Sequence, residues 1–142
     1  MRIGSLAAAR PTYYDRNGVS LAYEYTQYGI APHAETQRWT YTVPAGKKAY
    51  VETFRAFVYR ITAATSPNRY SAEIFVNPSA GGSYKIIEAT SYSNVADTSQ
   101  LLNVGGSILL FAGDQIAGYT LDASTGGTLI VSVSIKVSQF DA

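Results

Sequence analysis

The sequence contains no cysteine, one methionine and one histidine. A chain without cysteine has neither a disulfide framework nor a thiolate ligand for a metal, and a single histidine cannot form a histidine cluster. The chain is nevertheless 142 residues long, which is the usual size of one domain with its own hydrophobic core. We therefore expect it to fold without disulfides, metal ions or cofactors.

Charged residues are also scarce. They make up 15% of the chain, with a net charge of +1, whereas about 25% is typical of soluble domains. Residues 1–60 hold eight Lys and Arg against four Asp and Glu, and residues 61–142 hold three against six. A nucleic-acid-binding domain would show a denser basic patch, so we expect no nucleic-acid partner. The uneven charge distribution instead favours electrostatic attraction to an acidic protein surface. The low charge content and the 13% of aromatic residues indicate that part of the surface is covered by other proteins.

No apolar run approaches the about 18 residues of a membrane-spanning helix. The apolar segment 3–9 is short and is followed at once by Arg10, whereas a secretory signal needs a longer apolar stretch after its positive start. Its three alanines, 7–9, could imitate a cleavage site. We expect no membrane association.

From Trp39 onward, apolar and polar residues alternate with a period of two, which is typical of half-buried β-strands. The clearest pattern is in the last segment, where five residues are predicted to face the core: Leu129, Val131, Val133, Ile135 and Val137. The segments expected to be strands are 39–43, 49–61, 72–76, 84–90, 100–104, 108–111, 115–121 and 129–137. Within 49–61 the alternation changes phase near Phe54, which indicates a bulge or a second covered face.

The connections between these segments are short and rich in Gly, Pro and Asp. Parallel strands need crossovers of a dozen or more residues, so the strands must be mainly antiparallel. About eight such strands in one domain predict an all-β fold, an antiparallel β-sandwich or jelly roll. The glycine pairs 81–82, 105–106 and 126–127 lack the Lys-Ser/Thr of a phosphate-binding loop and are predicted to be hairpin glycines, with 105–106 separating two strands.

Residues 1–38 differ from the jelly-roll domain predicted over 39–142, because they carry five of the twelve tyrosines and only one short alternating stretch, 19–25. Tyrosine offers a large, rigid contact surface and is enriched at interfaces. The segment is therefore predicted to be an extended N-terminal arm that orders on a neighbouring molecule. The alternative is a strand and a loop that pack on the chain's own sheets. The candidate interaction residues of the arm are Arg10, Tyr13, Tyr14, Arg16, Tyr23, Tyr25, Tyr28 and Arg38.

No residues of the sequence form a recognisable catalytic or metal-binding set. The single histidine, His33, follows Pro32 in the least regular segment, so we interpret it as a surface or interface residue, although composition alone does not exclude a Ser-His-Asp triad. Four aspartates lie far apart in the sequence and give calcium no support: Asp97, Asp114, Asp122 and Asp141. Asp114 and Asp122 are predicted to be turn formers that bond nearby backbone. We expect no enzymatic activity.

Two stretches resemble small jelly-roll proteins of tailed-phage virions. The segment 43–52, VPAGKKAYVE, resembles their opening strand pair. The segment 109–116, LLFAGDQI, together with 122–127 and the alternating last strand, resembles their closing half. Over residues 39–142 the chain is similar to the capsid decoration, or cement, proteins of long-tailed bacteriophages, in particular those of Thermus.

The resemblance implies a homotrimer that is made in the host cytoplasm and sits on the outside of an expanded capsid, where arms tie neighbouring copies of the major capsid protein together. No motif of residues 1–38 matches that family residue by residue. Three function classes remain open: a structural decoration protein, a receptor- or glycan-binding module of a phage tail or fibre, and an enzyme on a β scaffold. The second needs an exposed aromatic cluster or an ion-bound loop, and the third needs an acid–base pair.

Overall fold

The computed structural model describes residues 18–29, 35–65, 69–92, 95–123 and 126–142. These residues form eight β-strands and no helix. The strands are β1 (Val19–Gly29), β2 (Thr36–Thr42), β3 (Lys47–Thr62), β4 (Tyr70–Asn77), β5 (Tyr84–Ser91), β6 (Thr98–Phe111), β7 (Gln115–Asp122) and β8 (Thr128–Asp141). The predicted all-β, antiparallel fold is confirmed.

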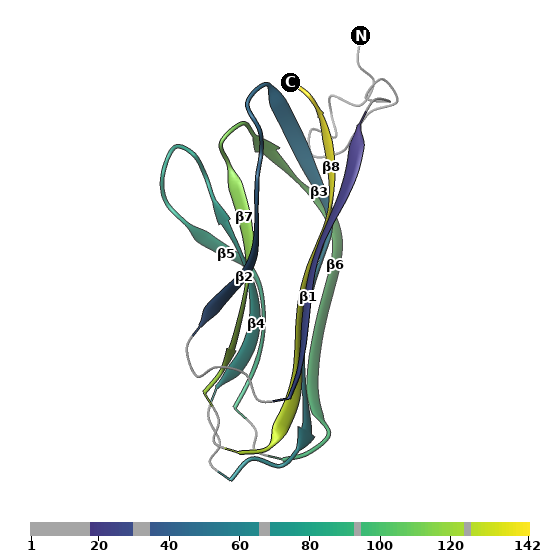
Figure 1. Cartoon of the computed structure of the whole chain (residues 1–142), viewed down its shortest axis with the longest axis vertical. Helices are drawn as coiled ribbons and strands as arrows, with labels where there is room; N and C mark the ends of the chain where they lie inside the picture. The colour runs from purple at the N-terminus through teal and green to yellow at the C-terminus, as the bar shows by residue number, and fades with distance from the viewer. Residues whose placement is uncertain (1–17, 30–34, 66–68, 93–94, 124–125) are drawn as a thin grey trace.

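The strands form two four-stranded sheets that pack face to face (Figure 1). The order is β1-β8-β3-β6 in the first sheet and β2-β7-β4-β5 in the second, and every pairing is antiparallel. Each strand therefore lies in the other sheet from the strand before it, except that β5 follows β4 in the same sheet. This is the arrangement of a jelly roll with its two Greek keys. No described segment is a helix long and apolar enough to cross a bilayer.

The predicted boundary between an arm and a domain at residue 38 is wrong for part of the segment. β1 pairs with β8 along its whole length, from Val19 opposite Gln139 to Gly29 opposite Leu129. β2, which begins at Thr36, pairs with β7. A strand with this register buries alternate side chains against its own core, so residues 19–29 and 36–38 belong to the sandwich, as the alternative interpretation had it. Residues 1–17 lie outside the described part of the chain.

The phase change predicted near Phe54 is confirmed as a bulge in β3. The register shifts between Val51 and Thr53 against both neighbouring strands. Core-facing residues are odd-numbered before the bulge and even-numbered after it, since Ala49 and Val51 are buried, as are Phe54 and Ala56. The extra residue, at position 52, lets a sixteen-residue strand keep its apolar side chains inward along both halves.

The predicted break at glycines 105–106 is wrong. Both residues lie inside β6, a continuous strand of fourteen residues, and Gly105 pairs with Thr53. The shift of register at the β3 bulge also falls here, because Val51 pairs with Ile108 and Thr53 with Gly105. The glycines therefore accompany an irregularity in paired strands rather than a hairpin. By contrast, the pairs at 81–82 and 126–127 lie outside the strands with positive φ, between 70° and 101°. The first pair lies in the β4–β5 hairpin, as predicted, whereas the second connects β7 to β8 in the other sheet and so is not in a hairpin.

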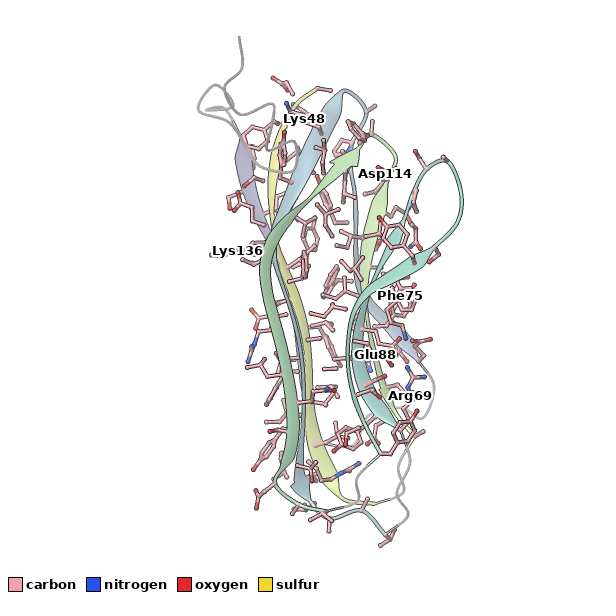
Figure 2. The ribbon with its side chains drawn as sticks, turned by 180° about the vertical axis from the view of Figure 1, so that it is seen from behind. Lys48, Arg69, Phe75, Glu88, Asp114 and Lys136 are labelled. Carbon is pink, nitrogen blue, oxygen red and sulfur yellow. The ribbon has the colours of Figure 1, made fainter. Side chains whose placement is uncertain are left out.

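The core lies between the sheets and is almost wholly aliphatic and aromatic (Figure 2). All five residues predicted to face inward from the last strand are buried, with at most 3% of their surface exposed. They interdigitate with residues of the second sheet such as Tyr70, Ile74 and Ile116. Because β8 lies between β1 and β3, this strand is the apolar centre of the first sheet.

The turn from β6 to β7 is held by Asp114, as the sequence predicted. Its carboxylate accepts hydrogen bonds from the backbone N–H of Phe111 at 2.9 Å and of Ser79 at 2.8 Å. Partial burial raises the pKa of Asp114, but these hydrogen bonds outweigh burial and hold the pKa below its ordinary value. The second bond ties this turn to the connection between β4 and β5.

Candidate interaction surface

The aromatic residues of β1 and β2 close one edge of the sandwich. The ring of Tyr23 lies 6.0 Å from that of Trp39 and 5.5 Å from that of Tyr41. The indole N–H of Trp39 donates to the carbonyl of Val133 at 3.1 Å, and the Tyr41 hydroxyl donates to Gln139 at 2.9 Å. Both bonds join the second sheet to the first. Burial, with the nearby Tyr23 hydroxyl, raises the pKa of Tyr41 to about 12.

The other described residues predicted for the arm contribute to the same edge. The Arg38 guanidinium lies 4.5 Å from the centre of the Tyr25 ring, and its Nε donates to the Thr120 hydroxyl at 2.8 Å. Tyr23, Tyr25 and Arg38 thus contact other residues of their own chain rather than pointing outward as a set. Tyr28 lies in β1, with its backbone opposite Ile130. Four further candidates lie outside the described residues: Arg10, Tyr13, Tyr14 and Arg16.

A buried ion pair lies at the other end of the core. Arg60 on β3 and Asp122 on β7 are each exposed by 1% or less, and their charged atoms are 3.9 Å apart. The guanidinium also lies 4.5 Å from the centre of the buried Tyr70 ring. Asp122 is therefore not the turn former that the sequence predicted, since it pairs inside the core from the end of β7. The alternation of residues along β7 could have indicated this, because Asp122 is even-numbered, like the buried Ile116 and Thr120.

The outer face of the second sheet carries four charges that neutralise one another. Its charged cluster consists of Arg69, Glu73, Lys85 and Glu88. Arg69 pairs with both glutamates, and the Lys85 ammonium lies 3.3 Å from Glu73 and 2.9 Å from Glu88. Figure 2 shows Arg69 and Glu88 on this face, beside Phe75. Sequence reasoning missed the cluster because the residues are brought together by the pairing of β4 with β5.

The outer face of the first sheet differs, because it carries aromatic rings beside positively charged side chains. The rings of Phe57 and Tyr59 on β3 stack with centres 6.4 Å apart, and the Arg55 guanidinium lies 5.4 Å from the Phe57 ring. Leu101, opposite Phe57 on β6, is half exposed. Lys136 projects outward from β8 on the same face (Figure 2).

Large apolar side chains are exposed at both ends of the sandwich. Phe111, at the end of β6, and Tyr84, at the start of β5, lie at the end that carries the β2–β3, β4–β5 and β6–β7 turns. Tyr92 and Val95, between β5 and β6, lie at the opposite end. Three of these four side chains are exposed by 59–64%. Sixteen residues of β3 connect the two ends, a distance of about 50 Å at about 3.3 Å per residue.

The aspartates considered for calcium are dispersed. Asp97 accepts from the Tyr59 hydroxyl at 2.6 Å, and Asp141 pairs with Lys47 at the C-terminal end of β8. Within the ranges that the structure describes, no three His, Cys, Asp or Glu residues are grouped as a metal site would require. His33 lies outside those ranges.

Comparison with known proteins supports the fold and does not identify a function. No protein-family model matches the sequence. No curated protein matches it either. Among solved structures, the latent protein PorU from Porphyromonas gingivalis superposes with a TM-score of 0.50 at 12% identity, over 87% of this chain and 13% of that one.

Two further solved structures are more distant. The infectious bursal disease virus Gx strain structure gives a TM-score of 0.39 at 10% identity, over 88% of this chain and 32% of that one. The globular domain of a zebrafish complement 1qA protein gives 0.36 at 16% identity, over 69% and 65%. The chain thus spans less than two thirds of each of these three proteins. The superposition on PorU, at 12% identity, shows a likeness of fold alone.

Proposed function

We propose that this chain is a non-enzymatic structural protein of a bacteriophage virion, which binds the outside of an expanded capsid as a homotrimer and cements neighbouring capsomers. The observation that carries the proposal is the exposure of large apolar side chains at both ends of the sandwich, about 50 Å apart at about 3.3 Å per strand residue. A protein that joins two neighbours needs two separate contact regions. The resemblance of residues 39–142 to capsid decoration proteins supports the same function.

The fold suits this role. The interior is closed by cross-sheet hydrogen bonds at the β1–β2 edge and by an aliphatic core. A rigid sandwich of this kind transmits force between its ends with little deformation, because close-packed interiors are hard to compress. Three copies around a closed axis can sit on a local three-fold position of an icosahedral shell.

The test uses expanded, empty capsids of a long-tailed Thermus phage, stripped of their own decoration protein. We expect the chain to sediment with these capsids and to raise their melting temperature. The double variant Tyr92→Ser/Val95→Ser removes the apolar contact at one end, and Phe111→Ser removes one at the other. Each is expected to bind capsids but to lose most of the heat protection, since one end alone cannot bridge.

Thr42→Ala, at an exposed polar position of β2, serves as the matched control and should protect fully. Failure of the wild-type chain to sediment with capsids, or heat protection that survives the loss of either end, would contradict the proposal. A chain beginning at Gly18 tests the remaining candidate arm, residues 1–17. It keeps all of β1, so we expect it to fold and to protect capsids less well.

A further inference from the structure

The outer face of the first sheet contains a hollow of about 200 Å³ at which three ionisable side chains converge. Glu24 on β1 and Arg55 on β3 both lie opposite Ser134 on β8. Because neighbouring strands are about 4.8 Å apart, Glu24 and Arg55 stand roughly 10 Å from each other, with the small serine between them. Lys136, two residues along β8 and opposite Ala22, completes the wall.

The three charged side chains of this hollow are not engaged in ion pairs with other described residues. Of the ion pairs formed among the described residues, none involves Glu24, Arg55 or Lys136. Arg55 contacts the face of the Phe57 ring instead, which leaves its N–H groups able to donate. The hollow therefore has a net charge of +1, whereas the charged cluster on the opposite face sums to zero.

The size of the hollow restricts what it can hold. Pockets that enclose a cofactor or another small ligand usually measure about 300–1,000 Å³, so about 200 Å³ is too small for such a ligand. It is enough for a single side chain that enters from another protein. Phe57 and the half-exposed Leu101 lie beside it on the same face, and arginine and aromatic residues are the types enriched where proteins meet.

We propose that this face docks onto an acidic protein surface, with a partner carboxylate seated between Arg55 and Lys136 and apolar partner atoms against Phe57 and Leu101. In identifying the partner as the capsid shell, the inference rests on the proposed function. Glu24 sets the orientation, because it repels a second carboxylate and accepts a hydrogen bond from a neutral or basic neighbour. Two cations and one carboxylate thus distinguish an acidic partner from a basic one.

The first experiment is an NMR titration of the full chain with a blocked nonapeptide of alternating glutamate and valine. The same peptide with glutamine in place of glutamate is the uncharged control, and a tetrasaccharide of galacturonic acid is the glycan control. We expect amide shifts around Ser134 and Lys136 with the glutamate peptide in low salt. These shifts should fade at 0.5 M salt, where the Debye length falls below about 5 Å.

Five variants test how each charge affects peptide binding. Arg55→Gln and Lys136→Gln should each weaken peptide binding at least about threefold, and Glu24→Gln should tighten it about twofold, as the loss of single exposed charge contacts predicts. Lys85→Gln removes one positive charge from the opposite face and should leave binding unchanged. Lys136→Arg keeps the charge and should retain binding.

Tighter binding of the tetrasaccharide than of the peptide would overturn the inference in favour of a glycan site. Weaker binding in Glu24→Gln, or shifts on the second sheet, would also overturn it. A change in the chain's own sedimentation on Arg55→Gln would show that the face joins copies of this chain instead.

Capsid sedimentation separates this inference from the proposed function. Variants that lose the peptide but still sediment with capsids would refute the docking face and leave the cementing function standing. A wild-type chain that binds the peptide but not capsids would refute the shell as partner, and with it the proposed function.

Discussion

Replacing Val133 by Asp should abolish folding at neutral pH. Val133 is fully buried at the centre of β8, opposite Tyr25 on one side and Ala56 on the other. Removing its burial costs about 1.5–3 kcal/mol, and an unpaired buried carboxylate adds several kcal/mol more. The sum is comparable with the whole stability of an ordinary domain, about 5–15 kcal/mol.

The assay is urea unfolding followed by the fluorescence of Trp39, the only tryptophan, whose indole bonds the Val133 carbonyl. Val133→Thr has nearly the same shape and buries one hydroxyl, so it should fold and lose about 1–3 kcal/mol. Lys136→Asp places the same carboxylate at an exposed position of the same strand and is the matched control. It should remain close to wild-type in stability.

The pH dependence gives a second check. In a folded Val133→Asp variant, burial would raise the pKa of the new carboxyl above about 3.9, its value in an unfolded chain. The cost of burying an ionised carboxylate would then be absent below a pH of about 3.9 and would grow as the pH rises above it. Any recovery of structure should therefore occur in acid. A variant as stable as wild-type at pH 7 would refute the register of β8.

Three further predictions concern side-chain contacts within and between the sheets. Gly118→Ala places a Cβ 2.5 Å from the Trp39 ring and should cost about 1–3 kcal/mol, and unchanged fluorescence and urea midpoint would contradict this packing. Asp122→Ala should cost about 3–5 kcal/mol because it leaves Arg60 without this buried counter-charge, whereas Arg60→Leu/Asp122→Leu should recover most of the loss in a double-mutant cycle. Because the pKa of Tyr41 is raised from 10.0 to about 12 in the folded chain, its contribution to stability should be complete below pH 10 and lost as the pH rises toward 12. Tyr41→Phe should remove that alkaline loss, and an ultraviolet titration should lose one late-ionising phenol.

Much of the fold could be predicted from the sequence because local patterning decides it. The period-two alternation of β8 placed five residues in the core correctly, and the phase change near Phe54 located the β3 bulge. Asp114 in the β6–β7 turn was recognisable by its chemistry alone. In each case the signal lies within a few residues of the structure that it predicts.

The failures share a dependence on distant strands. Glycines 105–106 resemble a turn, but pairing with β3 holds them in one long strand. The tyrosines of β1 resemble an arm until Trp39 and β8 provide partners for them. Arg60 and Asp122 are 62 positions apart in the sequence, and only the stacking of the two sheets brings them within 3.9 Å. The hollow likewise exists because three separate strands align small residues beside charged ones.

The pairing of β1 with β8 has a consequence for how the chain reaches its native state. Val19 pairs in register with Gln139, so β1 cannot take its place in the sheet until β8 has been synthesised and has left the ribosome. Topologies dominated by such remote pairings fold slowly, on timescales of about milliseconds to seconds. During synthesis the tyrosines of β1 remain exposed for as long as the last strand is missing. Rapid synthesis of many copies would thus present many unpaired β1 strands at once, which favours aggregation.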